Sequence, residues 1–152
     1  MDDAQLKLSS QVCFPLYSAS RLITKAYKPY LDEMGITYPQ YLVLMVLWEN
    51  DTLSVNQITE KLLLNTNTLS PLLKRMEKME LLQRNRSETD ERSVIVTLTE
   101  KGKNLKDQAK PIPDKLIKVL LTENVNVDDV IQLKEMLNKW IKVLTEDNKN
   151  LE

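Results

Sequence analysis

The stretch from Asn65 to Arg92 constrains the fold of this chain most, because it places an amphipathic helix directly before two β-prone segments. Its apolar side chains have the i, i+3, i+4, i+7 spacing of one buried helix face. They are Leu69, Leu72, Leu73 and Met76. The opposite face carries Asn67, Ser70, Lys74 and Lys78, with Arg75 beside them. Short polar side chains read base edges and cations hold phosphates, so this face is typical of a DNA-reading helix, but also of a solvated surface.

A short helix is expected immediately before this stretch. Ser54 and Gln57 have the spacing of a capping box, in which each side chain bonds the backbone N–H of the other residue. The inner face of this helix consists of Val55, Ile58 and Leu62. Only the residues around 64–66 separate it from the amphipathic helix. Two short helices joined by a tight turn indicate a helix-turn-helix.

Two β-prone segments, 81–87 and 92–98, follow with a charged turn from Glu88 to Glu91 between them, and they predict a hairpin. A hairpin directly after a helix-turn-helix is called a wing. Its cations are Arg84, Arg86 and Arg92. Arg92 lies near the tip, where it is placed to enter a minor groove, and Asp90 is placed to hold it by a charge-assisted bond. The alternative is a ribbon that covers the core and has a solvated tip.

Two helices and a short strand are predicted upstream. The first helix covers residues 5–33 and ends at Gly35, because glycine readily adopts the left-handed conformation of helix ends. Thr37 and Gln40 have capping-box spacing at the start of the second helix. The run YLVLMVLWEN makes this second helix apolar on nearly all sides, so we expect it to be buried. Leu53 is expected to make a short strand contact.

Prolines predict where helices begin or break, since a proline inside a helix cannot donate to the carbonyl group four residues earlier. Pro15 indicates that the first helix begins or kinks near it. Pro71 indicates that the second helix of the helix-turn-helix begins near Asn67 or bends there. A fifth helix begins at Thr99, and two further prolines predict a bend or break within residues 110–114.

A last helix is expected over residues 127–147. One side of it carries Val130, Leu133, Leu137, Trp140, Ile141 and Leu144. The terminal helices have more apolar surface than a small winged domain can cover, so we predict a homodimer formed by residues 5–35 and 112–147. A DNA-binding lobe over 37–98 and a connecting helix over 99–111 complete one mainly helical domain, 1–152.

The composition argues against an enzyme. The chain has 152 residues, no histidine and only two glycines. The lack of histidine removes the commonest acid–base residue and nearly every common zinc site, and two glycines cannot form a phosphate-cradling loop. No catalytic residue, metal or cofactor is therefore expected.

The charge is small but unevenly distributed. The net charge is −1, whereas residues 61–86 carry six cations against two anions. A local basic patch favours sequence-selective DNA binding over indiscriminate coating. No apolar run approaches the ~20 residues needed to cross a membrane. The polar start, MDDAQLKLSSQ, is unlike a signal peptide, so a cytoplasmic protein with no membrane partner is expected.

Helix, helix, helix-turn-helix, wing and two closing helices resemble the layout of the MarR family of transcriptional regulators. DERSV at 90–94 and LTEKG at 98–102 are similar to the wing signature of that family. The branch that regulates organic hydroperoxide resistance (OhrR) is resembled by CFPLY at 13–17, YKPYLD at 27–32, ITYPQY at 36–41 and TLSPLLKRME at 68–77. This resemblance covers most of residues 6–105.

The resemblance implies a dimeric winged-helix repressor that binds a pseudo-palindromic double-stranded DNA operator and releases it when a cysteine is oxidised by an organic hydroperoxide. Cys13 matches the reactive cysteine, and the tyrosines around it match Tyr17, Tyr27 and Tyr38. Groove-facing positions match Thr66, Asn67, Thr68, Ser70 and Lys74, to which the sequence adds Arg75 and Arg86. Arg92 matches the wing arginine and Asp90 its neighbour. The chain departs from the family at Asn65 and Asn67, where Asp and Gly are common, and at Glu80, which replaces a usual glycine.

Cys13 and Tyr27 lie 14 residues apart on one stripe of the first helix. That separation is about 21 Å along a straight helix, so they can meet only across a dimer with antiparallel first helices. Phenol donors aimed at the sulfur would stabilise its thiolate. Thiolate attack on a peroxide gives a sulfenic acid, which an external low-molecular-weight thiol must resolve because the chain has no second cysteine. The alternative is an inert core cysteine.

Other functions stay open at this point. They are a broader, global redox-responsive regulator, a MarR-type regulator gated by a small phenolic ligand in the same pocket, and a thiol peroxidase. The absence of histidine and of a resolving cysteine argues against the peroxidase. Ligand gating predicts that a Cys13→Ser protein still releases DNA when ligand is added, whereas oxidation gating predicts that it stays bound under peroxide.

Overall fold

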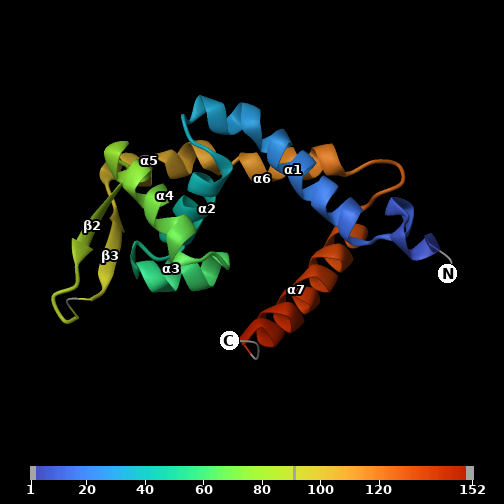
Figure 1. The fold of residues 1–152 in the computed structure, drawn as a ribbon. Helices are drawn as coiled ribbons and strands as arrows, with labels where there is room; N and C mark the ends of the chain where they lie inside the picture. The colour runs from blue at the N-terminus through green and yellow to red at the C-terminus, as the bar shows by residue number, and fades with distance from the viewer. Residues whose placement is uncertain (1–2, 91, 150–152) are drawn as a thin grey trace. The chain divides into compact units, whose positions relative to one another are not determined.

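A computed structural model describes residues 3–90 and 92–149, and its contacts divide the chain into two compact units, Met1–Ile112 and Pro113–Glu152. The first unit is shown in blue to amber in Figure 1. Its elements are α1 (Cys13–Glu33), α2 (Tyr38–Glu49), β1 (Thr52–Ser54), α3 (Val55–Leu62), α4 (Thr66–Lys78), β2 (Leu82–Arg86), β3 (Val94–Leu98) and α5 (Glu100–Ala109). Helix α6 (Ile112–Leu120) begins at the border between the units, and α7 (Val127–Lys149) follows it.

The start of α1 corrects the sequence prediction. Two short 3-10 helices, Asp3–Leu6 and Leu8–Ser10, precede it, so the range predicted from residue 5 is wrong before Cys13, whereas the start predicted near Pro15 is confirmed. The cause is Pro15, which would lack its hydrogen bond in a helix interior but is tolerated in the first turn, where N–H groups have no partner within the helix. The predicted end is confirmed, since Gly35 has φ 68°.

Helix α2 is the centre of the first unit. Gln40 contributes to the predicted capping box, because its Oε1 accepts the N–H of Thr37 at 2.9 Å. The helix is buried as its all-round apolar sequence predicts. It supplies Val43, Leu44 and Leu47, none of which has measurable exposure. Ile58, Leu69, Leu73, Met76 and Val96 surround them and are equally inaccessible. Each such aliphatic side chain contributes roughly 1.5–3 kcal/mol by burial.

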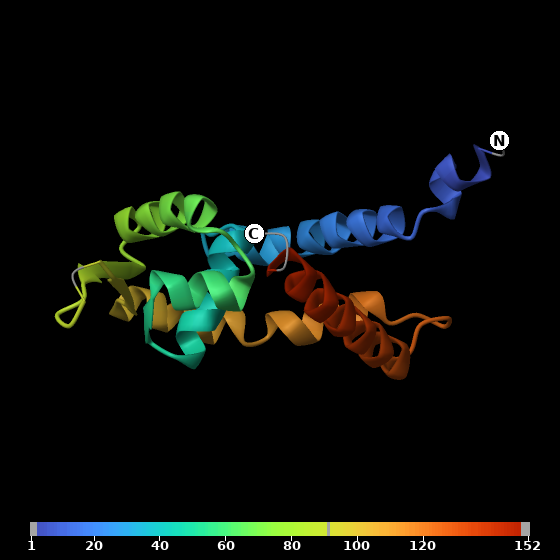
Figure 2. The same ribbon diagram turned by 60° about the horizontal axis from the view of Figure 1, so that its bottom comes forward.

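Helices α3 and α4 form the predicted helix-turn-helix (Figure 2). Ser54 caps α3 through the expected reciprocal bonds with Gln57, at 2.8 and 3.1 Å. At the start of α4, the side-chain oxygen of Asn65 accepts the N–H of Thr68 at 2.8 Å. This cap places the first residue of α4 one position before Asn67, and the helix continues through Pro71.

The wing is part of a three-stranded antiparallel sheet in the order β1-β3-β2. The predicted strand contact of Leu53 is confirmed, because Leu53 pairs with Val96. The strands of the hairpin are shorter at the tip than predicted, since Ser87 turns the chain by accepting the N–H groups of Thr89 and Asp90 at 3.3 and 3.2 Å. Glu91, in the predicted turn, lies outside the described residues.

The second unit contains most of α6 and all of α7. The interruption between Ala109 and Ile112 confirms the break predicted from the prolines. Asn126 and Asp129 cap the start of α7 by bonding each other's N–H groups, at 2.8 and 3.1 Å. Apolar residues left exposed on this helix include Ile131, Leu133, Met136, Trp140, Ile141 and Leu144. No helix within the described part of the chain is long and apolar enough to cross a membrane.

Candidate nucleic-acid interface and cysteine site

The buried face of α4 determines which of its side chains face solvent. Leu69, Leu73 and Met76 have no exposed surface and Leu72 retains 5%. Because the apolar face of α4 is buried, the polar and cationic side chains predicted to contact DNA lie on its solvent-facing side. Thr66, Asn67, Thr68, Lys74, Arg75, Arg86, Asp90 and Arg92 are exposed and Ser70 is half-buried. Helix α4 and the hairpin thus present one polar surface with a surplus of cations.

A groove of about 180 Å³ lies between the start of α4 and the hairpin. It brings together Thr66 and Ser70 from the helix and Arg92 from the wing, three residues predicted from sequence. It also contains Asn56 of α3, which sequence reasoning missed although its place in the first turn after the Ser54 cap was a usable signal. The groove is open toward solvent and supplies hydroxyl, amide and guanidinium groups, which are the donors that bind phosphates and base edges.

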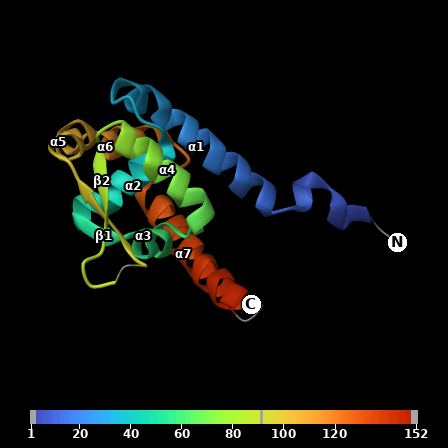
Figure 3. The same ribbon diagram turned by 60° about the vertical axis from the view of Figure 1, so that its left-hand side comes forward.

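Arg84, one of the wing cations named from sequence, lines the same groove as Arg92 and is held there in an ion pair. Its backbone N–H, Nε and Nη2 all donate to the carboxylate of Glu77 on α4, at 3.0, 3.0 and 2.7 Å. The side chains retain 24% and 36% exposure. The bonds from Arg84 hold the pKa of the Glu77 carboxyl below its usual value. This ion pair joins α4 to β2, which lie side by side when viewed from the hairpin (Figure 3).

Asp90 stabilises the wing tip in a way that differs from the prediction. Its Oδ1 accepts the backbone N–H of Arg92 at 3.0 Å, instead of the guanidinium. The carbonyl of Asp90 accepts the N–H of Ser93 at 2.9 Å. Asp90 therefore shapes the turn, and Arg92 lines the groove beside α4.

Cys13 is exposed and is the first residue of α1. Tyr17, one turn further on, is 62% exposed, and the guanidinium of Arg21 lies 5.0 Å from its ring centre. Because α1 is continuous, Cys13 and Tyr27 are held about 21 Å apart along its axis. A single chain therefore does not bring the thiol to the tyrosine predicted to surround it.

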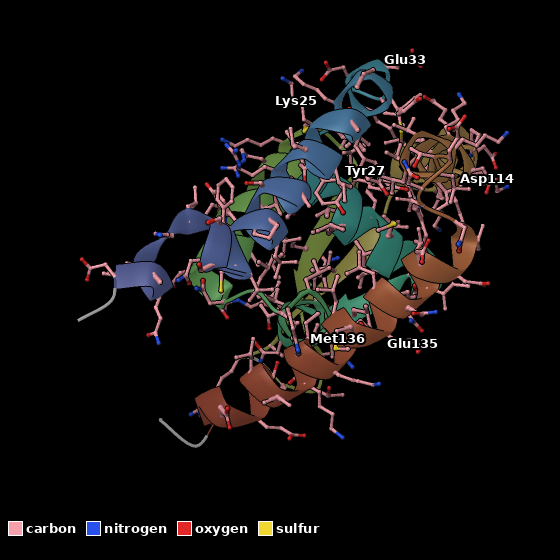
Figure 4. The ribbon with its side chains drawn as sticks, turned by 90° about the vertical axis from the view of Figure 1, so that its right-hand side faces the viewer. Lys25, Tyr27, Glu33, Asp114, Glu135 and Met136 are labelled. Atoms are coloured by element: carbon pink, nitrogen blue, oxygen red, sulfur yellow. The ribbon has the colours of Figure 1, made fainter. Side chains whose placement is uncertain are left out.

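Tyr27 and Tyr38 are brought together where α1 passes the start of α2. Their ring centres are 4.9 Å apart, and Tyr41 completes the cluster at 5.8 Å from Tyr27 and 6.3 Å from Tyr38. Tyr27 and Lys25 leave α1 on different sides (Figure 4). Burial raises the pKa of all three phenols above 10.0, so they are hydrogen-bond donors at neutral pH. Sequence reasoning missed Tyr41, whose only signal was its place three residues after Tyr38.

A second cavity, of about 400 Å³, borders Tyr38 between α1 and the start of α2. Its floor includes the buried side chains of Leu31 and Ile36. Lys25 and Lys28 line it, and Lys28 is paired with Asp32 at 2.6 Å.

Comparison with known proteins agrees with this architecture. The family described as transcriptional regulator SarA/Rot matches residues 25–109. The organic hydroperoxide resistance transcriptional regulator of Bacillus subtilis (strain 168) is 47% identical over 143 residues, or 94% of this chain and 95% of that protein. The HTH-type transcriptional regulator MgrA of Staphylococcus aureus is 37% identical over 143 residues, or 93% of this chain and 95% of that protein. Reduced AbfR bound to DNA, from Staphylococcus epidermidis, has a TM-score of 0.77 at 34% identity over 95% of this chain and 99% of that chain.

A helix-turn-helix followed directly by a hairpin, with cations on the shared outer face, defines a winged-helix transcriptional regulator. The chain belongs to the SarA/Rot family of transcriptional regulators, which is MarR-like, and the resemblance predicted from sequence is confirmed. Proteins of this family are regulators and not enzymes.

Proposed function

We propose that this protein is a transcriptional repressor that binds a pseudo-palindromic operator as a homodimer and releases it when an organic hydroperoxide oxidises Cys13. The observation that carries the proposal is the placement of one exposed cysteine at the start of α1 and a cluster of neutral phenols near the other end. An antiparallel pair of α1 helices brings each thiol to the Tyr27 and Tyr38 of the other chain.

DNA reading is assigned to α4 and the wing. Helix α4 enters the major groove, where Asn67, Thr68 and Ser70 are the short polar side chains that contact base edges and Lys74 holds phosphate. Arg92 reaches the adjacent minor groove, where the potential is most negative. Thr66, Arg75 and Arg86 add contacts, and Asp90 supports the tip of the wing.

The dimer interface is assigned to residues 5–35 and 112–147. Residues 37–98 form the DNA-binding lobe, residues 99–111 form the connecting helix, and the whole chain acts as one functional domain. Exposed apolar side chains support this assignment. On the N-terminal side they include Leu6, Leu8, Val12, Phe14, Leu16 and Leu22. The exposed face of α7 adds further apolar surface of the kind that a second copy covers.

The chemistry of the switch has two steps. The Cys13 thiolate attacks the outer oxygen of a hydroperoxide, the O–O bond breaks, and the products are a sulfenic acid and an alcohol after the alkoxide takes a proton. A low-molecular-weight thiol then attacks the sulfenic sulfur, forming a mixed disulfide and releasing water. The added group displaces the tyrosines and so shifts the two DNA-binding lobes of the dimer. Their separation then no longer matches the spacing of about 34 Å between the half-sites of the operator.

A DNA gel shift on wild-type protein and Cys13→Ser, with and without an organic hydroperoxide, tests the proposal. The DNA is the duplex that the wild-type protein enriches from a random-sequence pool. We expect the hydroperoxide to release wild-type protein and to leave Cys13→Ser bound. Equal release of both proteins would exclude Cys13 as the sensor, and sustained peroxide consumption with added thiol would favour a thiol peroxidase instead.

A ligand-gated regulator is the second candidate, because the cavity beside Tyr38 has an apolar floor and a cationic border. It predicts that a phenolic compound releases both proteins from DNA without oxidant. A global redox-responsive regulator shares the Cys13 mechanism and differs in the number of operators bound, which genome-wide mapping of binding sites measures. We place the protein in the cytoplasm, together with its operator DNA.

A further inference from the structure

Glu77 is an acidic residue in α4, the helix to which DNA reading is assigned. It is the only anion of α4, Thr66–Lys78, all of which the structure describes. Steps of four and seven residues connect Thr66, Ser70 and Glu77, so the three side chains lie along one flank of the helix. Thr66 and Ser70 line the groove beside the hairpin. The carboxylate therefore projects at the edge of the surface that faces DNA, where a negative charge opposes phosphate binding.

Arg84 neutralises this carboxylate, and the carboxylate in turn occupies Arg84. Two of the guanidinium nitrogens and the backbone N–H donate to Glu77, so the arginine is held against α4. Arg84 also lines the groove, together with Ser70 and Arg92. A free guanidinium in that place is a bidentate phosphate ligand. The ion pair thus converts a phosphate-binding cation into a brace between the helix and the wing.

We propose that Glu77 determines the DNA specificity of this protein by holding Arg84 as that brace and away from the phosphates. The proposal rests on the operator binding proposed above. Phosphate contacts add affinity for every sequence, whereas the angle between α4 and the wing decides whether both reach their base edges together. Glu77 is a positioning residue, because it acts through Arg84 and not by touching a base.

Glu77→Gln tests the proposal, since glutamine keeps the size of the side chain but not the charge that holds Arg84. Binding is measured against salt concentration on a random-sequence duplex and on the duplex that the wild-type protein enriches from that pool. The freed arginine steepens the slope of log affinity against log salt by about 0.9 for each additional phosphate that it neutralises, hence by roughly two in a dimer. The ratio of selected to random affinity falls by about tenfold, the scale of one impaired base contact.

Two further variants distinguish the loss of the ion pair between α4 and the wing from the release of an unpaired cation. Arg84→Met removes the brace without freeing a cation, so the affinity ratio falls while the salt slope does not steepen. Asp107→Asn is the matched control, because it frees Lys110 from a comparable 2.6 Å ion pair at the end of α5, away from the reading surface. Neither the ratio nor the slope changes in this control.

The outcomes distinguish this proposal from the function on which it rests. If the wild-type protein enriches no sequence, operator binding itself fails. If it enriches one and Glu77→Gln keeps both the slope and the ratio, operator binding stands and the role of Glu77 is overturned. Thermal unfolding shows whether Glu77→Gln is folded; where it is not, an unchanged ratio in Arg84→Met overturns the proposal.

Discussion

The rings of Tyr27 and Tyr38 pack with their centres 4.9 Å apart and their planes at 56°. The contact joins α1 to the start of α2 and leaves two neutral phenols on neighbouring elements. Such a pair offers two O–H donors to an anion that approaches from another chain. In the proposed dimer that anion is the Cys13 thiolate.

Tyr38→Phe removes one donor and keeps the ring packing. We expect an organic hydroperoxide to release this variant from DNA about tenfold more slowly than wild type, which corresponds to the loss of roughly one hydrogen bond to the thiolate. The measurement is the rate of release followed by fluorescence anisotropy. Tyr41→Phe is the control, since its ring belongs to the same cluster but is not among the residues assigned to the thiol. Equal slowing in both variants would contradict a specific role for Tyr38.

The tyrosine cluster makes stability depend on alkaline pH. The folded state raises the pKa of Tyr41 above 10.0 by burial and by the nearby Tyr38, so the unfolded chain loses this proton first as pH rises. The stabilising contribution is therefore complete below pH 10 and is lost as pH rises through the folded pKa. Tyr41→Phe should flatten the decline in the free energy of unfolding above pH 10, measured by urea titration. The same flattening in the exposed Tyr17→Phe protein would point to another cause.

Glu80 connects α4 to β2 with φ 60°, a conformation that favours glycine. Glu80→Gly keeps the bond from the Thr99 hydroxyl to the carbonyl of residue 80, at 2.6 Å, because that bond uses the backbone. We expect a net stabilisation of about 0.5–1 kcal/mol after the greater entropy of unfolded glycine is subtracted. Thermal unfolding measures it. Gly35 has φ 68° and open space for a Cβ, so replacing it with glutamate should lower the free energy of unfolding by a similar amount.

Gly102 allows α5 to pack against the base of the hairpin, beside Leu81 and Leu98. A Cβ at this position would lie 2.1 Å from the carbonyl oxygen of Leu81, which is backbone and cannot rotate away. The carbonyl of Gly102 also accepts the indole N–H of Trp48 at 3.0 Å, so a displaced α5 loses this bond. Gly102→Ala should destabilise by about 2–4 kcal/mol in chemical denaturation. The exposed Asn104→Ala, on the same helix, should change stability by less than about 0.5 kcal/mol.

Arg92→Ala tests the wing assignment. We expect weaker operator binding and a salt slope that is shallower by about 0.9 for each phosphate that the arginine no longer neutralises. Binding is measured at several salt concentrations with the enriched duplex. Lys110→Ala removes a cation at the end of α5 and should leave the slope unchanged. Unaltered affinity of Arg92→Ala at fixed salt would mean that the wing tip does not reach DNA.

Much of the fold is predictable because it depends on residues three or four apart in the chain. The spacing of Leu69, Leu73 and Met76 predicts which face of α4 is buried, and by exclusion which face is available to DNA. The cap formed by Ser54 and Gln57 is a contact within one helical turn. A helix brings such residues together whatever the rest of the protein does.

The sequence by itself determined that a helix-turn-helix and a hairpin are present, that α4 has one cationic face and that the chain has a single thiol. Only the tertiary structure decided that Arg84, which lines the groove with Arg92, is paired with Glu77, and that Tyr41 joins Tyr27 and Tyr38. Whether residues on separate elements come into contact depends on the direction that the chain takes in the turns between those elements. The direction of each turn depends on how all the elements bury their apolar side chains in one core, and the spacing of residues within one helix or strand does not predict this.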